Sequence, residues 1–133
     1  MIAGDRPTTW STGTVPQDIE EQVALSAQVV EQNLGFGDQV HQPRPIDHLA
    51  GFRSRKAADA AGEELVAAGY RIDGRYRRFL TVWLEFSAMT AVDHATAAAF
   101  TREVVGIVNR HGGTYDGWGG FLVAADDEAP PGA

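Results

Sequence analysis

The sequence predicts an α+β fold, a ferredoxin-like βαββαβ two-layer sandwich with an extra N-terminal helix. Three observations predict it. Two segments alternate apolar and polar residues with the period of two that strands show, three others repeat apolar residues at helical spacing, and turn-forming residues separate them. The order is helix, then strand–helix–strand–strand–helix–strand, which is typical of two strand–helix–strand units joined by a hairpin.

Each element has its own signal. Thr14 or Asp18 is the expected cap of the first helix, and Ser54 and Asp93 are the expected caps of the other two. The pair Asp73-Gly74 is a strong turn signal and predicts the hairpin between the second and third strands. The expected helices span residues 16–34, 54–68 and 93–111, and the expected strands span residues 46–53, 70–72, 78–87 and 114–123.

Right-handed crossovers predict the arrangement of the sheet. They place the strands that begin at residues 46 and 78 in the centre, with the last strand beside the first. The second and third helices then cover one face, which the alternation fills with Leu80, Val82, Leu84 and Phe86. The other face carries Leu49 and Trp83. We expect the first helix, a partner, or a second copy in a homo-oligomer to cover it.

The length and composition fit one domain. The chain has 133 residues, and we expect a flexible N-terminus over residues 1–13, a single domain over residues 14–123, and a mobile acidic tail over residues 124–133. The chain contains no cysteine, which excludes disulfides and thiolate metal sites. It shows no signal-peptide pattern and no apolar run of the roughly 20 residues that a spanning helix needs. We therefore expect a cytoplasmic protein without a membrane partner.

The net charge of −7 is unevenly distributed. Residues 51–80 carry seven basic against four acidic groups, whereas the segments before and after them are both acidic. An acidic protein is repelled by phosphate backbones, so we expect no direct binding of nucleic acid and an attraction to basic proteins. The alternative interpretation is that the negative charge only keeps a small protein soluble. The arginines around the expected hairpin lack the glycine–aromatic signature of the RNA-recognition motif, and we interpret them as protection of an edge strand.

Residues 112–120 are the most unusual stretch, because five glycines surround Tyr115, Asp116 and Trp118. Gly112 and Gly113 can end the preceding helix. The glycines beside Trp118 lie inside an expected strand, where glycine indicates a bulge or the close approach of another backbone. An aromatic ring between glycines and near a carboxylate is suited to recognition. The same segment also fits a purely structural role, with Asp116 in a turn and Trp118 in the core.

The sequence offers little for catalysis or for metal binding. The four histidines include no spaced pair of the kind that metal sites use, so we expect no metal and no cofactor. Asp47, His48, Tyr115 and Asp116 are a conceivable acid–base set, but no nucleophile accompanies them. We therefore expect a protein that is not an enzyme. The alternative is a small ferredoxin-like enzyme or ligand-binding domain with a pocket near His48, Tyr115 and Asp116.

Arg44 lies between two prolines, which fix the backbone and leave the side chain little entropy to lose on binding. A rigidly projected arginine near a tryptophan and an aspartate is typical of an interface hot spot. Equally, Arg44 can pair with Asp47 or Asp116 and hold the two strands together.

Two stretches resemble the regulator of ribonuclease activity B family, also called ribonuclease E inhibitor proteins. That family has the pattern Pro-Arg-x-(Val/Ile)-Asp-His-aromatic near its first strand and Gly-Gly-x-Tyr-Asp-Gly-Trp-Gly in its last. Here residues 43–49 read Pro-Arg-Pro-Ile-Asp-His-Leu, so that Leu49 replaces the usual aromatic, and residues 112–119 read Gly-Gly-Thr-Tyr-Asp-Gly-Trp-Gly. The resemblance covers roughly residues 15–123.

The resemblance implies a non-catalytic regulator with this sandwich fold, which binds a ribonuclease E/G-type protein and reduces RNA cleavage. The implied partner surface is a basic, arginine-rich scaffold region, which agrees with a chain of net charge −7. The residues that we expect at the partner-binding site are those of the two matching stretches, namely Arg44, Asp47, His48, Tyr115, Asp116 and Trp118.

Overall fold

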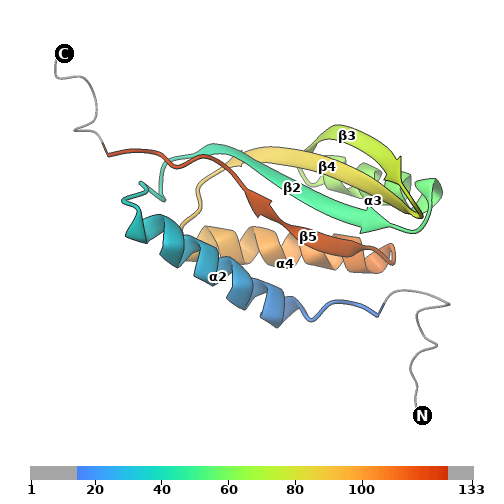
Figure 1. Cartoon of the computed structure of the whole chain (residues 1–133), viewed down its shortest axis with the longest axis horizontal. Coiled ribbons are helices and arrows are strands. Elements are labelled where there is room, and N and C mark those ends of the chain that lie inside the picture. The colour runs from blue at the N-terminus through green and yellow to red at the C-terminus, as the bar shows by residue number, and fades with distance from the viewer. Residues whose placement is uncertain (1–14, 126–133) are drawn as a thin grey trace, which may run out of the picture.

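The computed structural model describes residues 15–125 and shows two layers, with a four-stranded antiparallel sheet on one side and three helices on the other (Figure 1). The strand order is β3-β4-β2-β5, so the predicted sandwich with its extra N-terminal helix is confirmed. The expected flexible segment 1–13 lies outside the described residues, as does the part of the expected tail over residues 126–133. In chain order the elements are α2 (Ile19–Gly35), β2 (Arg44–Phe52), α3 (Arg55–Ala67), β3 (Arg71–Arg78), β4 (Thr81–Thr90), α4 (His94–Arg110) and β5 (Thr114–Gly119).

The second and third helices begin where the sequence predicts, and the first begins at Ile19, three residues after the expected start, with Asp18 and not Thr14 as its cap. Asp18, Ser54 and Asp93 are extended cap residues, and each side chain accepts a hydrogen bond from the backbone N–H three residues later. Such a bond satisfies one of the N–H groups that the first helical turn leaves free. Local capping chemistry therefore determines the starts of the helices.

The predicted hairpin turn at Asp73-Gly74 is wrong. Strand β3 continues through this pair, which forms a bulge against β4, and the Asp73 carboxylate accepts a bond of 2.7 Å from Arg71 Nε. The chain turns at Phe79 instead, in the left-handed region with φ 56°. Leu80, which we expected in the core, lies beside this turn and is 86% exposed. An aspartate–glycine pair thus fits a bulge as well as a turn, because both need a permissive backbone.

The core lies between the sheet and the helices. Alternate residues of β2 and of the first part of β4, residues 82–86, point inward and are at most 3% exposed, among them Ala50, Phe86 and Leu84. Small residues of α3, such as Ala58 and Ala61, let this helix approach the sheet closely. Burial of these apolar side chains is the main favourable contribution to the stability of the fold.

Helix α2 extends the helical layer and leaves the outer face of the sheet uncovered. Figure 1 shows α2 alongside α4, on the same side of the sheet. Ser26 Oγ and Thr101 Oγ1 join the two helices at 2.7 Å, and Val30 between them is fully buried. Of the three coverings that we expected for the outer face, the first helix is therefore excluded.

Candidate functional site

The two matching stretches lie side by side, as predicted, because β5 pairs with β2 in antiparallel register. His48 is opposite Trp118, and Leu49 is opposite Gly117. The register shifts after Leu49, so Asp116 has no partner on β2 and forms a bulge. Because of this shift Tyr115 is buried, whereas Asp116 is exposed to solvent.

Backbone conformation and close packing explain three of the five glycines of residues 112–120. Gly112 ends α4 in the left-handed region with φ 69°, and Gly117 has φ 115° at the bulge. At Gly113 a Cβ would lie 2.8 Å from the Gly51 carbonyl oxygen and 2.5 Å from the Phe52 ring. No side chain fits there without displacing backbone, so glycine permits the close approach of β5 to β2.

His48 and Tyr115 form a buried pair. The Nδ1 atom of His48 lies 2.7 Å from the Tyr115 hydroxyl, and the imidazole stacks on Phe86 with 5.0 Å between ring centroids. His48 is 3% exposed and Tyr115 is 4% exposed, so neither offers a surface to a partner in this conformation. Burial lowers the pKa of His48 from 6.5 to about 4 and raises the pKa of Tyr115. His48 is therefore neutral at pH 7.

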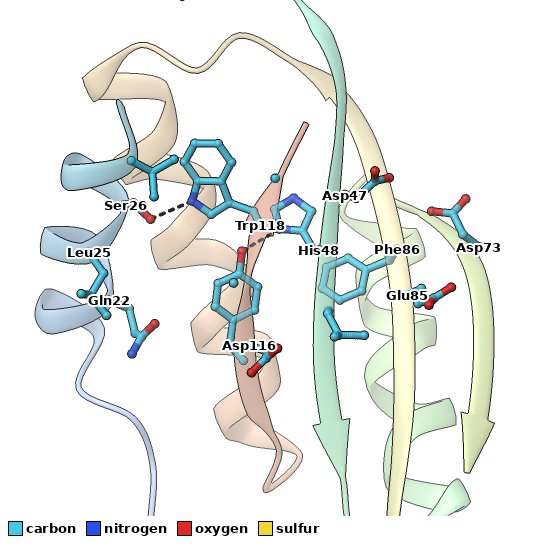
Figure 2. Close-up of a pocket in the computed structure, with 15 residues that line it drawn as sticks. Gln22, Leu25, Ser26, Asp47, His48, Asp73, Glu85, Phe86, Asp116 and Trp118 are labelled. Atoms are coloured by element: carbon cyan, nitrogen blue, oxygen red, sulfur yellow. Dashed lines mark hydrogen bonds between the residues drawn. The ribbon is translucent and has the colours of Figure 1, made fainter. Parts of the chain in front are cut away.

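Trp118 ties β5 to the helices. Its indole Nε1 donates a hydrogen bond to Ser26 Oγ on α2 (Figure 2), at 2.9 Å. Its ring meets Phe100 of α4 edge-on, with 5.2 Å between ring centroids. The side chain is partly buried. A second link is made by Gln17, whose amide binds both the N–H and the carbonyl of Tyr115 and so occupies the free edge of β5 at that residue. Both contacts hold the last strand in place.

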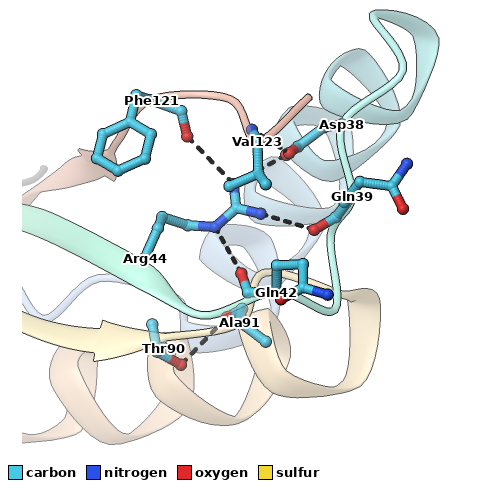
Figure 3. A network of polar contacts seen from close by, with 8 residues as sticks. All are labelled: Asp38, Gln39, Gln42, Arg44, Thr90, Ala91, Phe121 and Val123. Carbon is cyan, nitrogen blue, oxygen red and sulfur yellow. Dashed lines mark hydrogen bonds and ion pairs between the residues drawn. The ribbon is translucent and has the colours of Figure 1, made fainter. Parts of the chain in front are cut away.

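Arg44 is not projected toward solvent, and it pairs with neither Asp47 nor Asp116. It is 1% exposed, and its Nη1 lies 3.0 Å from Asp38 Oδ2 (Figure 3). The other bonds go to backbone carbonyls, which fixes the chain on both sides of the residue: Nε to Gln42, Nη2 to Gln39 and Nη1 also to Phe121. The expectation of an exposed hot spot at Arg44 is thus corrected. The flanking prolines position an interior cross-link.

The sequence reasoning missed Asp38, the partner of Arg44. Burial raises the pKa of this carboxyl, but the Arg44 bond and a 2.8 Å bond from the Val123 N–H outweigh it and lower the pKa below its usual value. Asp38 follows a helix-ending glycine and reads as an ordinary loop residue. Nothing in its local pattern distinguishes it.

The exposed part of the site is acidic. We call Asp47, Glu85 and Asp116, which surround Leu49 on the outer face of the sheet, the acidic patch. Leu49 is paired with Glu85 on one side and lies beside the Asp116 bulge on the other, and Asp47 is two residues away on the same face of β2. Within residues 15–125 none of the three carboxylates forms an ion pair. The outward position of Glu85 follows from the alternation along β4, although the sequence did not predict that Glu85 lies beside Asp47 and Asp116 in the acidic patch.

A groove connects the acidic patch with α2. It has a volume of about 850 Å³ and is lined by α2, by the β2–β5 pair and by the acidic patch, with no lysine or arginine among its lining residues. His48, Tyr115 and Asp116 all line it, but Figure 2 shows the Asp116 carboxylate pointing away from His48. The three groups therefore do not converge on one point as an acid–base set would.

No three acidic or histidine side chains within residues 15–125 lie close enough together to hold a metal ion. Likewise, none of the helices described here has the length and apolar character that a bilayer crossing requires.

The family model described as "Regulator of ribonuclease activity B" matches residues 24–120, which include most of α2, the full sheet and the other two helices. A search of curated proteins finds no match to the chain.

Proposed function

The chain belongs to the regulator of ribonuclease activity B family, and on that premise we propose that it is a non-catalytic regulator that binds a ribonuclease E/G-type enzyme in the cytoplasm. The basic scaffold region of that enzyme docks on the acidic patch. Binding there reduces the cleavage of RNA without any chemical step by this chain.

The observation that carries the proposal is the acidic patch itself. Three carboxylates without a described ion pair surround the apolar Leu49 on an uncovered sheet face, and no lysine or arginine lines the adjoining groove. Arginine side chains combine a charged, planar head with an apolar stem, so they suit a surface on which carboxylates surround an aliphatic residue. An arginine-rich segment is therefore complementary to this face in both charge and polarity.

The other predicted site residues act from inside. His48, Tyr115 and Arg44 are buried, so their part in the proposal is to hold β2 and β5 in the register that brings Asp47 and Asp116 to one face. Trp118 does the same by joining β5 to α2. The partner meets the carboxylates and not the motif as a whole.

The experiment is a binding measurement with a purified ribonuclease E/G-type enzyme from the same cells, at several salt concentrations. The variant Asp47→Asn/Asp116→Asn removes two charges from the acidic patch. At about 0.2–1 kcal/mol per exposed ion pair, affinity should fall by about 2- to 30-fold, and binding should become less sensitive to salt.

The matched control is Glu21→Gln/Glu63→Gln. Both carboxylates are exposed, lie away from the acidic patch and form no ion pair within the described residues. The control changes net charge equally and should bind like the parent protein. Equal losses in the two double variants would show that net charge alone acts, and the acidic patch would then not be the docking site.

A further inference from the structure

The basic residues without a described partner gather at one end of the sheet. The structure describes ten of the eleven lysines and arginines, and five of these ten form ion pairs: Arg44, Arg71, Arg75, Arg102 and Arg110. Within residues 15–125 the other five form none, and all are exposed. They are Arg53, Arg55, Lys56, Arg77 and Arg78, which we call the basic end.

The strand register places these five residues at one end of the sheet. Arg78 lies on the same face as Trp83, whereas Arg77, which is opposite the buried Val82, lies on the helix-facing side. Phe52 is opposite Val82 and Arg78 is opposite Thr81, so the end of β2, the start of α3 and the β3–β4 turn occupy the same end of the molecule, as Figure 1 also shows. Arg53 follows directly on β2, and Arg55 and Lys56 open α3. The positive charge of residues 51–80 is thereby concentrated in space, although the whole chain carries −7.

Two aromatic rings lie on the outer sheet face at this end. Trp83 lies across Gly51, because a Cβ on that glycine would come within 3.0 Å of Cζ3 and 3.2 Å of Cη2 of the indole. The ring thus rests on bare backbone, and the side chain is partly buried. Its cross-strand neighbour on β3 is Tyr76, which is 42% exposed.

The turn between β3 and β4 adds an apolar tip. Phe79 and Leu80 are 87% and 86% exposed, and Phe79 adopts the left-handed backbone conformation that bulky residues rarely take. Neither side chain contributes to the core. Their exposure indicates that this end of the molecule meets something other than water.

We propose that this end of the sheet binds single-stranded nucleic acid. Bases stack on Trp83 and Tyr76, and the guanidinium and ammonium groups of the basic end neutralise the phosphates. Flat aromatic rings beside a positively charged track are the combination by which proteins hold single strands without reading sequence. Glu85, two residues beyond Trp83 on β4, begins the acidic patch, which repels phosphate. The bound nucleic acid therefore crosses the basic end and does not follow β4.

This surface goes beyond the proposed function, because it uses different residues and a partner of opposite charge. The expectation that nucleic acid is not bound was drawn from the net charge and from the missing signature of the RNA-recognition motif. The structure separates the charges, and it is the local field that a phosphate meets. A membrane surface fits less well, because insertion of Phe79 and Leu80 would give the Trp83–Tyr76 pair no role.

The test measures fluorescence anisotropy of a labelled oligouridine of about 12 nucleotides, a length within the usual range of single-strand sites, with the full chain. Arg77→Ala/Arg78→Ala should weaken binding and reduce the slope of log K against log salt by about 1.4, or about 0.7 for each lost phosphate contact. The control Arg102→Ala/Arg110→Ala removes the same charge from exposed, paired sites on α4 and should change affinity less than twofold. Equal losses in the two pairs would overturn the proposal.

Stacking has its own readout. Trp83→Leu and Tyr76→Ala should each weaken binding by about 5- to 150-fold, as expected for the loss of one stacked base. RNA should quench tryptophan fluorescence in the parent and in Trp118→Phe, but not in Trp83→Leu. Since Tyr76 lies on an edge strand, its variant keeps the test valid if Trp83→Leu fails to fold.

Further arms distinguish the source of the ligand. Tighter binding of the oligouridine than of a thymidine DNA of equal length assigns RNA, and the reverse assigns DNA; either result supports the stacking surface. The proposal is overturned if neither strand binds saturably. It is also overturned if vesicles of phosphatidylserine and phosphatidylcholine bind while RNA causes no quenching.

Discussion

Replacing Arg44 by methionine tests the buried ion pair on which the β2–β5 end of the fold depends. The guanidinium makes four hydrogen bonds, and the side chains of Arg44 and Asp38 are 1% and 0% exposed. Methionine keeps much of the aliphatic stem but leaves the Asp38 carboxylate buried without its cation. Breaking a buried pair in this way costs about 3–5 kcal/mol, out of a total stability of about 5–15 kcal/mol for a domain.

Urea unfolding followed by circular dichroism measures the loss. At an m-value of about 1.5–2 kcal/mol/M, the midpoint should fall by about 1.5–3 M. Arg102→Met removes an exposed arginine that pairs with Glu20, and it should cost less than about 1 kcal/mol. The double variant Asp38→Leu/Arg44→Met should be more stable than Arg44→Met alone, because no charge is left buried. A loss below about 1 kcal/mol in Arg44→Met, or a double variant less stable than either single one, would refute the reasoning.

Three further predictions concern the interior. Burial lowers the pKa of His48 from 6.5 to about 4, so between these pH values the unfolded chain binds more protons than the folded one. Up to about 3 kcal/mol of folding stability should therefore be lost as the pH falls from 6.5 to 4. The variant His48→Phe/Tyr115→Phe should remove this pH dependence when unfolding is measured across the same range. Trp118→Ala should cost about 3 kcal/mol or more by urea unfolding, because the ring packs on Phe100 and binds α2, and a loss under about 1 kcal/mol would contradict that role. Gly113→Ala should cost about 1–3 kcal/mol or more by thermal unfolding, because its Cβ would lie 2.8 Å from a backbone oxygen, and a variant as stable as the parent would show that β5 can shift.

Most of the fold could be predicted because its signals are local. A cap residue acts three residues away, and the alternation along β4 directly sets which side chains face the helices. The position of the hairpin turn was predicted wrongly, because the two alternatives at Asp73-Gly74, a turn or a bulge, place the same demands on the backbone. What decides between them is the register against β4, a contact that the local sequence does not contain.

The site was predictable as a location but not in its chemistry. The adjacency of β2 and β5 followed from topology, and it brought Asp47 and Asp116 to one face. The position of Arg44 did not follow, because its partner Asp38 lies in a loop whose path depends on packing against residues 121–123. A buried arginine needs a partner for its charge, and that partner is brought near only by the folded chain. From the local sequence alone, a charged residue between two prolines is therefore expected to be exposed.

The motif that carries the family likeness is mostly interior, and this changes what family membership implies. Arg44, His48 and Tyr115 are each at most 4% exposed, so these positions specify how the last strand joins the first. Under the proposed function a partner meets the residues around them instead, and Leu49, where the family pattern has an aromatic, lies at the centre of the acidic patch. The motif then specifies the scaffold, whereas the proposed affinity for a given ribonuclease depends on exposed residues that can change while the motif stays the same.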